Sequence, residues 1–247
     1  MIKKRNYSSL ILATLVALFC AFTVQAQEVS LDELLTKYPL EKADALQSAN
    51  QQLIQMGEKG LTDLCSRVTP PEQGGDAGVR YAISGLTKFV KLQNDESHRT
   101  LVVQALLQAL KQAENKTIKA FLIEQIQFIG KQEVIAPLSP YLMDEILCEP
   151  VAQAFFAIKT PEASAALLFA LPQVSDALKP TVIKTLGDLR SRAAALALAP
   201  YTESQDLNTR LMAYYAIANI GDPSAANPLK RALTKTTGYE QSQAISA

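Results

Sequence analysis

Four segments in the C-terminal half of the chain share one pattern: an apolar helical segment ends at a junction, and a second helical segment begins. The junction residues are Gly130, Lys159, Gly187 and Gly221, which lie 29, 28 and 34 residues apart. A leucine follows the junction after eight residues in three units and after nine in the Gly187 unit. One helix pair cannot bury both of its faces, so such units stack around a shared core. The repeat therefore predicts an all-α fold, a right-handed superhelix (α-solenoid) of stacked helix pairs.

The junction residues suggest how each first helix ends and each second helix begins. Gly187 and Gly221 are expected to end their helices in the left-handed conformation that favours glycine. Asp188 and Asp222 follow them as expected N-caps, and Pro223 suits a first helical turn, where no N–H is needed. Second helices are expected over three short, alanine-rich segments, at residues 163–171, 193–199 and 225–233.

The N-terminal part has helical patterns with a fainter repeat. Apolar spacing predicts helices at residues 44–56, 61–68, 80–92 and 100–113, with the glycines at 57 and 60 separating the first two. Residues 69–78 contain two prolines and three glycines and are expected to form an exposed loop. Sustained alternation of apolar and polar residues is absent from the sequence, so essentially no sheet is expected.

The N-terminus has the features of an export signal. The sequence Met-Ile-Lys-Lys-Arg precedes an apolar run at residues 10–24, and small residues follow at the cleavage position. This run is shorter than the roughly 20 residues that a spanning helix needs. We expect cleavage between Ala26 and Gln27, no stable membrane span afterwards, and a periplasmic or extracellular protein. Residues 1–26 are then the signal peptide, 27–115 irregular helical repeats or a cap, 116–236 regular repeats, and 237–247 a polar tail or linker.

Two cysteines, Cys65 and Cys148, remain after removal of the signal peptide. An oxidising compartment would allow them to pair, but two cysteines do not form a disulfide framework. Both stand among apolar residues of helical segments, where a free cysteine packs as a small hydrophobic residue. Buried free thiols are the expected state, and pairing stays open.

The residue types that most catalytic and metal sites need are scarce. The charge is balanced, with 24 Lys and Arg against 24 Asp and Glu, which gives no reason to expect nucleic acid. The single histidine, His98, excludes a metal site built from several imidazoles within one chain and is expected to be solvated or to cap a helix. The carboxylate pairs Asp95-Glu96 and Asp144-Glu145 are expected at helix starts, where acids favour the helix dipole. We expect no catalytic residue, no cofactor and no bound metal.

Two short segments are candidates for an interaction surface. Arg190 and Arg192 flank Ser191 and form a tight cationic spot, which suits either an anionic ligand or a solvated turn. Tyr214 and Tyr215 are adjacent on a predicted helix, so one ring should face the core and the other a surface. Tyrosine is enriched at the centres of protein interfaces, although plain packing also accounts for the pair.

The segment from Asp206 to Pro223, with an early Arg210, small alanines and Ile-Gly-Asp-Pro at the turn, resembles a known repeat. It is similar to HEAT-type repeats of the short class that also occurs in phycobilisome-lyase-like proteins. The resemblance covers residues 116–236 well and 41–115 loosely. It implies an α-solenoid whose early arginine is structural. Several positions depart from the pattern: Lys119, Cys148 and Asp176 stand where that arginine is usual, and Lys159 replaces the turn glycine.

A narrower similarity concerns the segment with Val68-Thr-Pro-Pro and then Arg80-Tyr-Ala-Ile-Ser-Gly-Leu. It resembles N-terminal regions of exported bacterial proteins in which a domain of the 3-keto-disaccharide hydrolase type often follows. This resemblance implies an alternative function, the accessory N-terminal region of a carbohydrate-processing hydrolase whose catalytic domain lies beyond residue 247.

The expected function is that of a noncatalytic exported scaffold. Stacked helix pairs present a concave ridge, expected to be formed by the second helices, and proteins of this architecture use such a ridge to bind other proteins. The expected partner is another protein, in the cell envelope, with a carbohydrate-active protein as the alternative.

Overall fold

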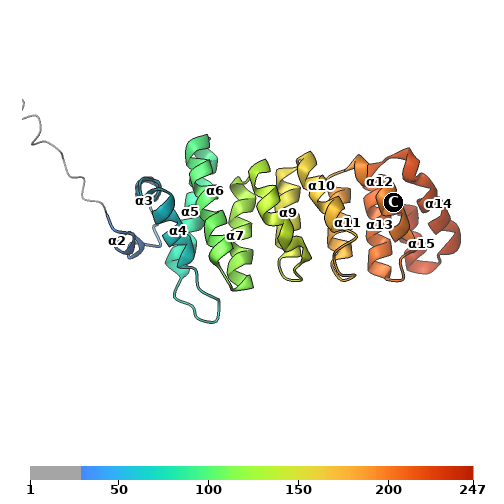
Figure 1. Cartoon of the computed structure of the whole chain (residues 1–247), viewed down its shortest axis with the longest axis horizontal. Helices are drawn as coiled ribbons and strands as arrows, with labels where there is room; N and C mark the ends of the chain where they lie inside the picture. The colour runs from blue at the N-terminus through green and yellow to red at the C-terminus, as the bar shows by residue number, and fades with distance from the viewer. Residues whose placement is uncertain (1–28, 247) are drawn as a thin grey trace, which may run out of the picture.

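The computed structural model describes residues 29–246 and shows one elongated stack of helices, with no strand among those residues (Figure 1). The fold is an α-solenoid, as the repeat predicts. The predicted signal peptide and its cleavage position at Ala26 and Gln27 lie outside the described residues. Within residues 29–246, no helix has both the length and the apolar character needed to cross a bilayer.

The α-helices follow one another with short connections. Their bounds are Leu31–Leu35 (α2), Ala43–Gln55 (α3), Gly57–Ser66 (α4), Ala77–Gln93 (α5), Glu96–Gln112 (α6), Lys116–Ile129 (α7), Ile135–Leu138 (α8), Cys148–Ile158 (α9), Pro161–Ala170 (α10), Lys179–Asp188 (α11), Ala195–Leu198 (α12), Leu207–Ile220 (α13), Ala226–Lys235 (α14) and Gly238–Ser246 (α15). Short 3₁₀ helices flank them at Gln132–Val134 (η1), Ser139–Met143 (η2), Arg192–Ala194 (η3), Ala199–Glu203 (η4) and Pro223–Ala225 (η5).

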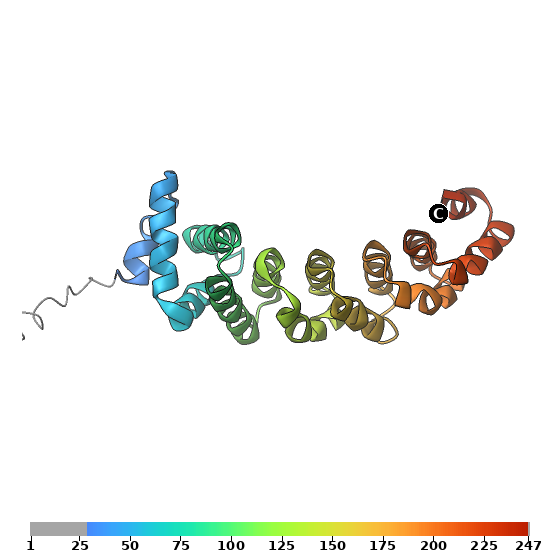
Figure 2. The ribbon, with the colours of Figure 1, turned by 90° about the horizontal axis from the view of Figure 1, so that it is seen from above.

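The helices form two rows, and the molecule curves toward one of them (Figure 2). The inner, concave row consists of α5, α7, α9, α11 and α13, and the outer row of α4, α6, α8, α10 and α12. The prediction that the second helices line the concave side is therefore wrong, because the inner row contains the helices that precede each junction. The reason is close packing: Gly187 of α11 lies directly against Ala216 of α13, so inner helices approach one another closely.

The junctions follow the prediction at one glycine and depart from it at another. Gly221 ends α13 with φ of 66°, the expected left-handed cap, and Asp222 accepts a hydrogen bond from Ser224 N at 2.9 Å. Gly187, in contrast, lies inside α11, and the left-handed residue of that turn is Arg190, with φ of 50°. Asp188 is the last residue of α11 and does not cap the next helix, so both predictions for this junction are wrong.

The outer-row segments are less regular than their alanine content suggests. The helix expected at residues 193–199 is split into η3, α12 and η4, and Pro200 lies in the last of these. The split is consistent with proline, which lacks the N–H that a continuing α-helix needs. The segment of α8 and η2 is divided in the same way around Pro140. Helices α10 and α14, by contrast, match the expected residues to within a few positions.

The N-terminal helices match the predicted ones, but α4, α5 and α6 each begin three or four residues earlier than expected. Gly57 and Gly60 begin α4 and do not separate it from the apolar residues that follow. Helix α5 begins at Ala77, inside the expected loop, because Asp76 ties the loop to the helix. Its carboxylate accepts hydrogen bonds from Thr69 N at 2.9 Å and from Nε of Arg80 at 2.7 Å.

The C-terminal segment is a helix and not the polar tail or linker that the sequence suggests. Residues Gly238–Ser246 form α15, which folds back beside α13. Glu240 of α15 pairs with Arg210 of α13, and Ala244 packs against Tyr214 with 4% of its surface exposed. An ion pair and an apolar contact therefore join this polar segment to α13.

Both cysteines are buried free thiols, as expected. Burial in apolar surroundings raises the pKa of Cys65 to about 12 and that of Cys148 to about 11. The thiolate form that reacts with oxidants and metals is therefore strongly disfavoured at both positions.

Candidate functional site

A polar array crosses the inner face of the solenoid from α11 to α13. The Asp188 carboxylate accepts a hydrogen bond from Nζ of Lys184 at 2.6 Å and another from the hydroxyl of Tyr215 at 2.7 Å. The hydrogen bond to Asp188 raises the pKa of Lys184, so the ammonium stays charged. Tyr215 nevertheless keeps 40% of its surface exposed. The array is thus fixed by the protein and still accessible to a partner.

The local sequence explains why these side chains meet. Lys184 and Asp188 are four residues apart and lie on one side of α11. The neighbour of Asp188 is Gly187, and the neighbour of Tyr215 is Ala216. A Cβ atom placed on Gly187 would lie 2.5 Å from Cα of Ala216, so only glycine allows the two helices to come this close. The same contact brings the Tyr215 hydroxyl within hydrogen-bond distance of Asp188.

Aromatic side chains with neighbouring cations continue along the inner row. Phe128 of α7 keeps 47% of its surface exposed, and Nζ of Lys91 lies 5.8 Å from its ring centroid. Phe156 of α9 has Nζ of Lys159 at 4.6 Å from its ring centroid. Such cation–π contacts hold aromatic rings at a surface while leaving them partly accessible. The inner face, defined here by Phe128, Phe156, Lys184, Asp188 and Tyr215, is our candidate interaction surface.

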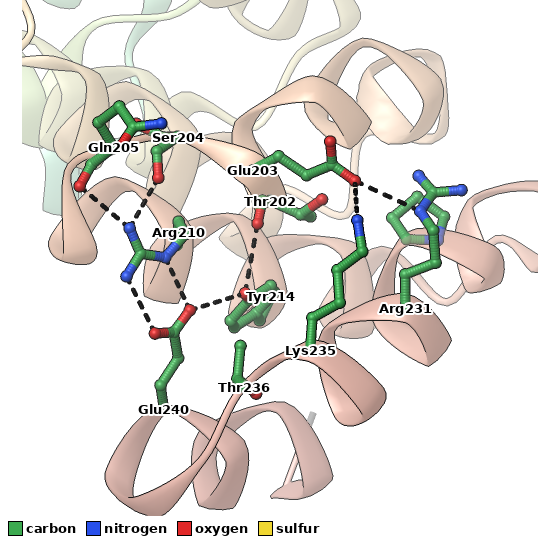
Figure 3. Close-up of a pocket in the computed structure, with 11 residues that line it drawn as sticks. Thr202, Glu203, Ser204, Gln205, Arg210, Tyr214, Arg231, Lys235, Thr236 and Glu240 are labelled. Atoms are coloured by element: carbon green, nitrogen blue, oxygen red, sulfur yellow. Dashed lines mark hydrogen bonds and ion pairs between the residues drawn. The ribbon is translucent and has the colours of Figure 1, made fainter.

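A second feature is a hollow of about 340 Å³ at the C-terminal end of the row, between η4, α13, α14 and α15 (Figure 3). Arg210 forms its floor and binds Glu240 through two contacts, Nε to Oε1 at 2.7 Å and Nη2 to Oε2 at 2.9 Å. The Nη1 atom of Arg210 donates to the carbonyl groups of Ser204 and Gln205 at 2.7 and 3.0 Å. Arg231 and Lys235 lie at the rim and face the Glu203 carboxylate at 3.4 and 3.6 Å.

The ionisable groups of this hollow are shifted by their partners. The hydrogen bond from Arg210 lowers the pKa of Glu240, which therefore stays ionised. Burial, followed by the hydrogen bond to Glu240, raises the pKa of Tyr214 to about 12. The Tyr214 hydroxyl lies 3.0 Å from Oε1 of Glu240 and 3.3 Å from the Thr202 carbonyl oxygen, so one proton serves two acceptors.

The four residues predicted as an interaction surface, Arg190, Arg192, Tyr214 and Tyr215, do not form one surface in the structure. Tyr215 is exposed and Tyr214 has 1% of its surface exposed, so one ring faces the surface and the other the core, as predicted. Tyr214 thus cannot serve as a surface residue, which corrects that assignment. Arg190 lies in the turn that follows α11 and Arg192 begins η3, and both are exposed.

The sequence reasoning missed Lys184, Asp188 and Glu240 as members of these sites. The spacing of four between Lys184 and Asp188 was a usable signal, because such pairs meet on a helix. The pairing of Glu240 with Arg210 spans 30 residues and leaves no local signal in the sequence.

Asp95 and Asp144, each the first residue of a predicted carboxylate pair, accept backbone hydrogen bonds. Asp95 caps α6 by accepting hydrogen bonds from Ser97 N and His98 N, and Nδ1 of His98 lies 3.1 Å from Oδ2 of Asp95. Asp144 accepts from Ile146 N at 2.9 Å in the turn before α9. Asp95 agrees with the predicted acid at a helix start, whereas Asp144 lies four residues before α9, in the turn between η2 and that helix. No group of three or more potential metal ligands gathers in the part of the chain that the structure describes.

A buried arginine joins two neighbouring units of the N-terminal half. Nη1 of Arg99 donates to the carbonyl of Ile129 at 2.8 Å and to Oε1 of Glu133 at 2.6 Å. Its Nη2 donates to Glu96 at 2.6 Å, and Lys131 also reaches Glu96 at 2.7 Å. These contacts hold α6 against the end of α7, so the cluster stabilises the stacking.

Comparison with known proteins supports the repeat assignment for the C-terminal third of the chain. A family model described as HEAT repeats matches residues 164–247. A search of curated proteins found no match. The matched region includes α11, α13 and α15, and therefore the Lys184–Asp188–Tyr215 array and the C-terminal hollow, but not Phe128 or Phe156. This part of the chain is therefore similar to HEAT-type repeats.

Proposed function

We propose that this chain is a noncatalytic, exported HEAT-repeat scaffold that binds another protein of the cell envelope through its inner face. The fixed but exposed Lys184–Asp188–Tyr215 array carries the proposal. Ordering exposed side chains before binding reduces the entropy lost when a partner docks. The rings of Phe128, which is exposed, and Phe156, which is half-buried, each lie beside a lysine and add a side-chain type that is enriched at protein interfaces.

Export is part of the proposal and rests on the sequence of the first 26 residues. The alternative function, the accessory region of a hydrolase, is still supported by the resemblance of the segment around Val68 and Arg80. Its second support, a linker-like tail, is lost because residues 238–246 form α15. The scaffold is therefore the function that the described residues favour.

Affinity capture from crosslinked envelope extracts tests this function. The purified chain is compared with Tyr215→Ala, which removes the inner-face hydroxyl and ring, and with Phe169→Ala as the control. Phe169 lies on the outer-row helix α10 and is 74% exposed, so its removal costs little packing. A partner band that persists with Phe169→Ala and falls at least tenfold with Tyr215→Ala supports the proposal. Equal retention by all three chains contradicts it.

A further inference from the structure

Most turns after the inner helices contain a residue in the left-handed conformation. These residues have φ between 50° and 66° and are Asn94 after α5, Lys159 after α9, Arg190 after α11 and Gly221 after α13. Asparagine and glycine tolerate this conformation. Lysine and arginine adopt it at a cost, because their Cβ atom comes close to a carbonyl oxygen. The turns after α9 and α11 therefore hold cations at backbone positions that suit other residues.

The helix dipole accounts for the charge of these two residues but not for their position. The negative end of a helix favours a cation anywhere in its last turn. Neither α9 nor α11 has a basic residue in its last turn, where a cation would need no strained backbone. Strained left-handed residues cluster at functional sites. Two such cations in consecutive repeats indicate that the turn position itself is used.

Lys159 and Arg190 are both exposed and have no acidic partner. Within residues 29–246, no carboxylate lies at ion-pair distance from either side chain. Nζ of Lys159 instead lies 4.6 Å from the ring centroid of Phe156, a residue of the inner face. Arg192 differs, because the pKa of Asp222 is lowered by hydrogen bonds in its own turn and then by the charge of Arg192. The free positive charge of these two turns therefore belongs to Lys159 and Arg190.

The acids of the same two turns are engaged elsewhere. Glu162 lies in the first turn of α10, where the helix dipole favours a carboxylate. Asp188 accepts hydrogen bonds from Lys184 and Tyr215. We call the pair formed by Lys159 and Arg190 the cationic edge.

The solenoid spaces the two cations regularly. The inner helices run in the same direction, so the turns after them lie along one edge of the stack (Figure 1). Helices α9 and α11 are neighbours in the inner row, and packed helices are about 8–10 Å apart. In a polyproline II segment, residues three apart lie on the same side at a distance of about 9 Å. Carboxylates at every third residue of an extended segment therefore match the cationic edge.

We propose that the cationic edge binds an extended acidic segment of the partner protein, with one carboxylate at Lys159 and the next at Arg190. Phe156 lies beside Lys159 and belongs to the inner face, so one partner can contact both surfaces. The proposal rests on the proposed function, of which it specifies the chemistry of the partner.

Fluorescence anisotropy with the full chain and labelled peptides tests this assignment. The main probe consists of four Glu-Pro-Pro repeats, because proline favours the extended conformation of the residue before it. A second probe has glutamine in place of each glutamate. A third has the same composition as the main probe, but its glutamates are consecutive.

Three double variants are compared with the wild type. Lys159→Asn with Arg190→Asn removes both charges and keeps a residue type that tolerates the left-handed conformation. Lys159→Arg with Arg190→Lys keeps both charges. Lys111→Gln with Lys230→Gln removes two exposed cations on α6 and α14 and is the matched control. Far-UV circular dichroism checks that each chain is folded.

The wild type should bind the main probe at least fivefold more tightly than the glutamine probe or the probe with consecutive glutamates. The double asparagine variant should bind the main probe roughly fivefold more weakly, as expected for the loss of two exposed ion pairs. The charge-keeping variant and the control should stay within about twofold of the wild type. Affinity should fall as salt is raised, because exposed charges are screened.

Equal binding of the three probes by the wild type would overturn the proposal, as would an equal loss in the asparagine variant and the control. Binding to vesicles of anionic phospholipid that depends on Lys159 and Arg190, without binding of the main probe, would assign the edge to a membrane and also overturn it. Capture of the envelope partner through Tyr215 is measured separately, so failure of the peptide test leaves the inner-face function standing.

Discussion

Replacing Gly187 with alanine should separate the two inner-row helices that build the candidate interaction surface. A Cβ atom at position 187 would lie 2.5 Å from Cα and 2.7 Å from Cβ of Ala216. Carbon atoms in normal contact are at least about 3.5 Å apart, so α11 and α13 would have to move apart by about 1 Å. Because the obstructing atoms include backbone, a side-chain rotation cannot relieve the clash.

The magnitude follows from two opposing effects. Alanine in a helix interior is favoured over glycine by about 0.5–1 kcal/mol. Overpacking of a buried site costs about 1–3 kcal/mol, and a rigid backbone contact places this site toward the upper end. We therefore expect Gly187→Ala to lower the free energy of unfolding by about 1–2 kcal/mol. The same shift would stretch the 2.7 Å hydrogen bond between Tyr215 and Asp188 beyond hydrogen-bond range.

Urea unfolding followed by circular dichroism measures this change, and Gly85→Ala is the matched control. Gly85 also lies inside a helix, α5, but a Cβ atom there would meet only Cδ1 of Leu46 at 3.4 Å and Oδ1 of Asn50 at 3.8 Å. These are ordinary contacts, so Gly85→Ala should stabilise the protein by about 0.5–1 kcal/mol. Opposite signs for the two variants are expected. If Gly187→Ala stabilises the chain as much as Gly85→Ala does, the close contact of α11 and α13 is refuted.

Three further outcomes are expected. Arg99→Met should lower the free energy of unfolding by about 1.5–3 kcal/mol, because it removes charge-assisted hydrogen bonds and leaves the buried Ile129 carbonyl without that donor. Urea unfolding measures the loss, and a value below about 0.5 kcal/mol would contradict the structural role of Arg99. Glu240 has a pKa below its ordinary value of 4.5, so its stabilisation of α15 is present above that pH and is lost as the pH falls through the lower, folded-state value. Hydrogen exchange at residues 238–246 should therefore accelerate selectively on acidification, beyond the intrinsic change of the exchange rate. Cys65 and Cys148, with pKa values of about 12 and 11, should react with a thiol reagent at pH 8 only after unfolding, and rapid labelling of the native chain would contradict their burial.

The helical repeat could be predicted because its signals are local. Apolar spacing and a cap glycine depend on residues within one or two turns, and Gly221 behaves as this logic requires. Gly187 occupies the same repeat position as Gly221 but does not end its helix. It is glycine because a side chain there would clash with α13. Sequence alone does not distinguish a glycine needed for its φ angle from one needed for its small volume.

The curvature of the solenoid and the position of α15 depend on contacts between residues that are distant in the sequence. Which row is concave depends on how closely α11 approaches α13, a distance that no single segment encodes. Glu240 joins helix α15 to Arg210 of α13, 30 residues away in the chain. Its polar composition, considered alone, resembles that of a linker. The candidate site could not be predicted for the same reason: the hydrogen bond between Tyr215 and Asp188 joins two different repeats.

Photo-crosslinking from the inner face in cells of the source organism tests the central claim most directly. A photoreactive phenylalanine analogue replaces Tyr215 in one chain and Phe169, on the outer row, in another. The inner-face account predicts a discrete crosslinked product of one size from position 215 that is absent from position 169. No product from position 215, or the same product from both positions, would contradict the claim that this solenoid binds its partner through the inner face.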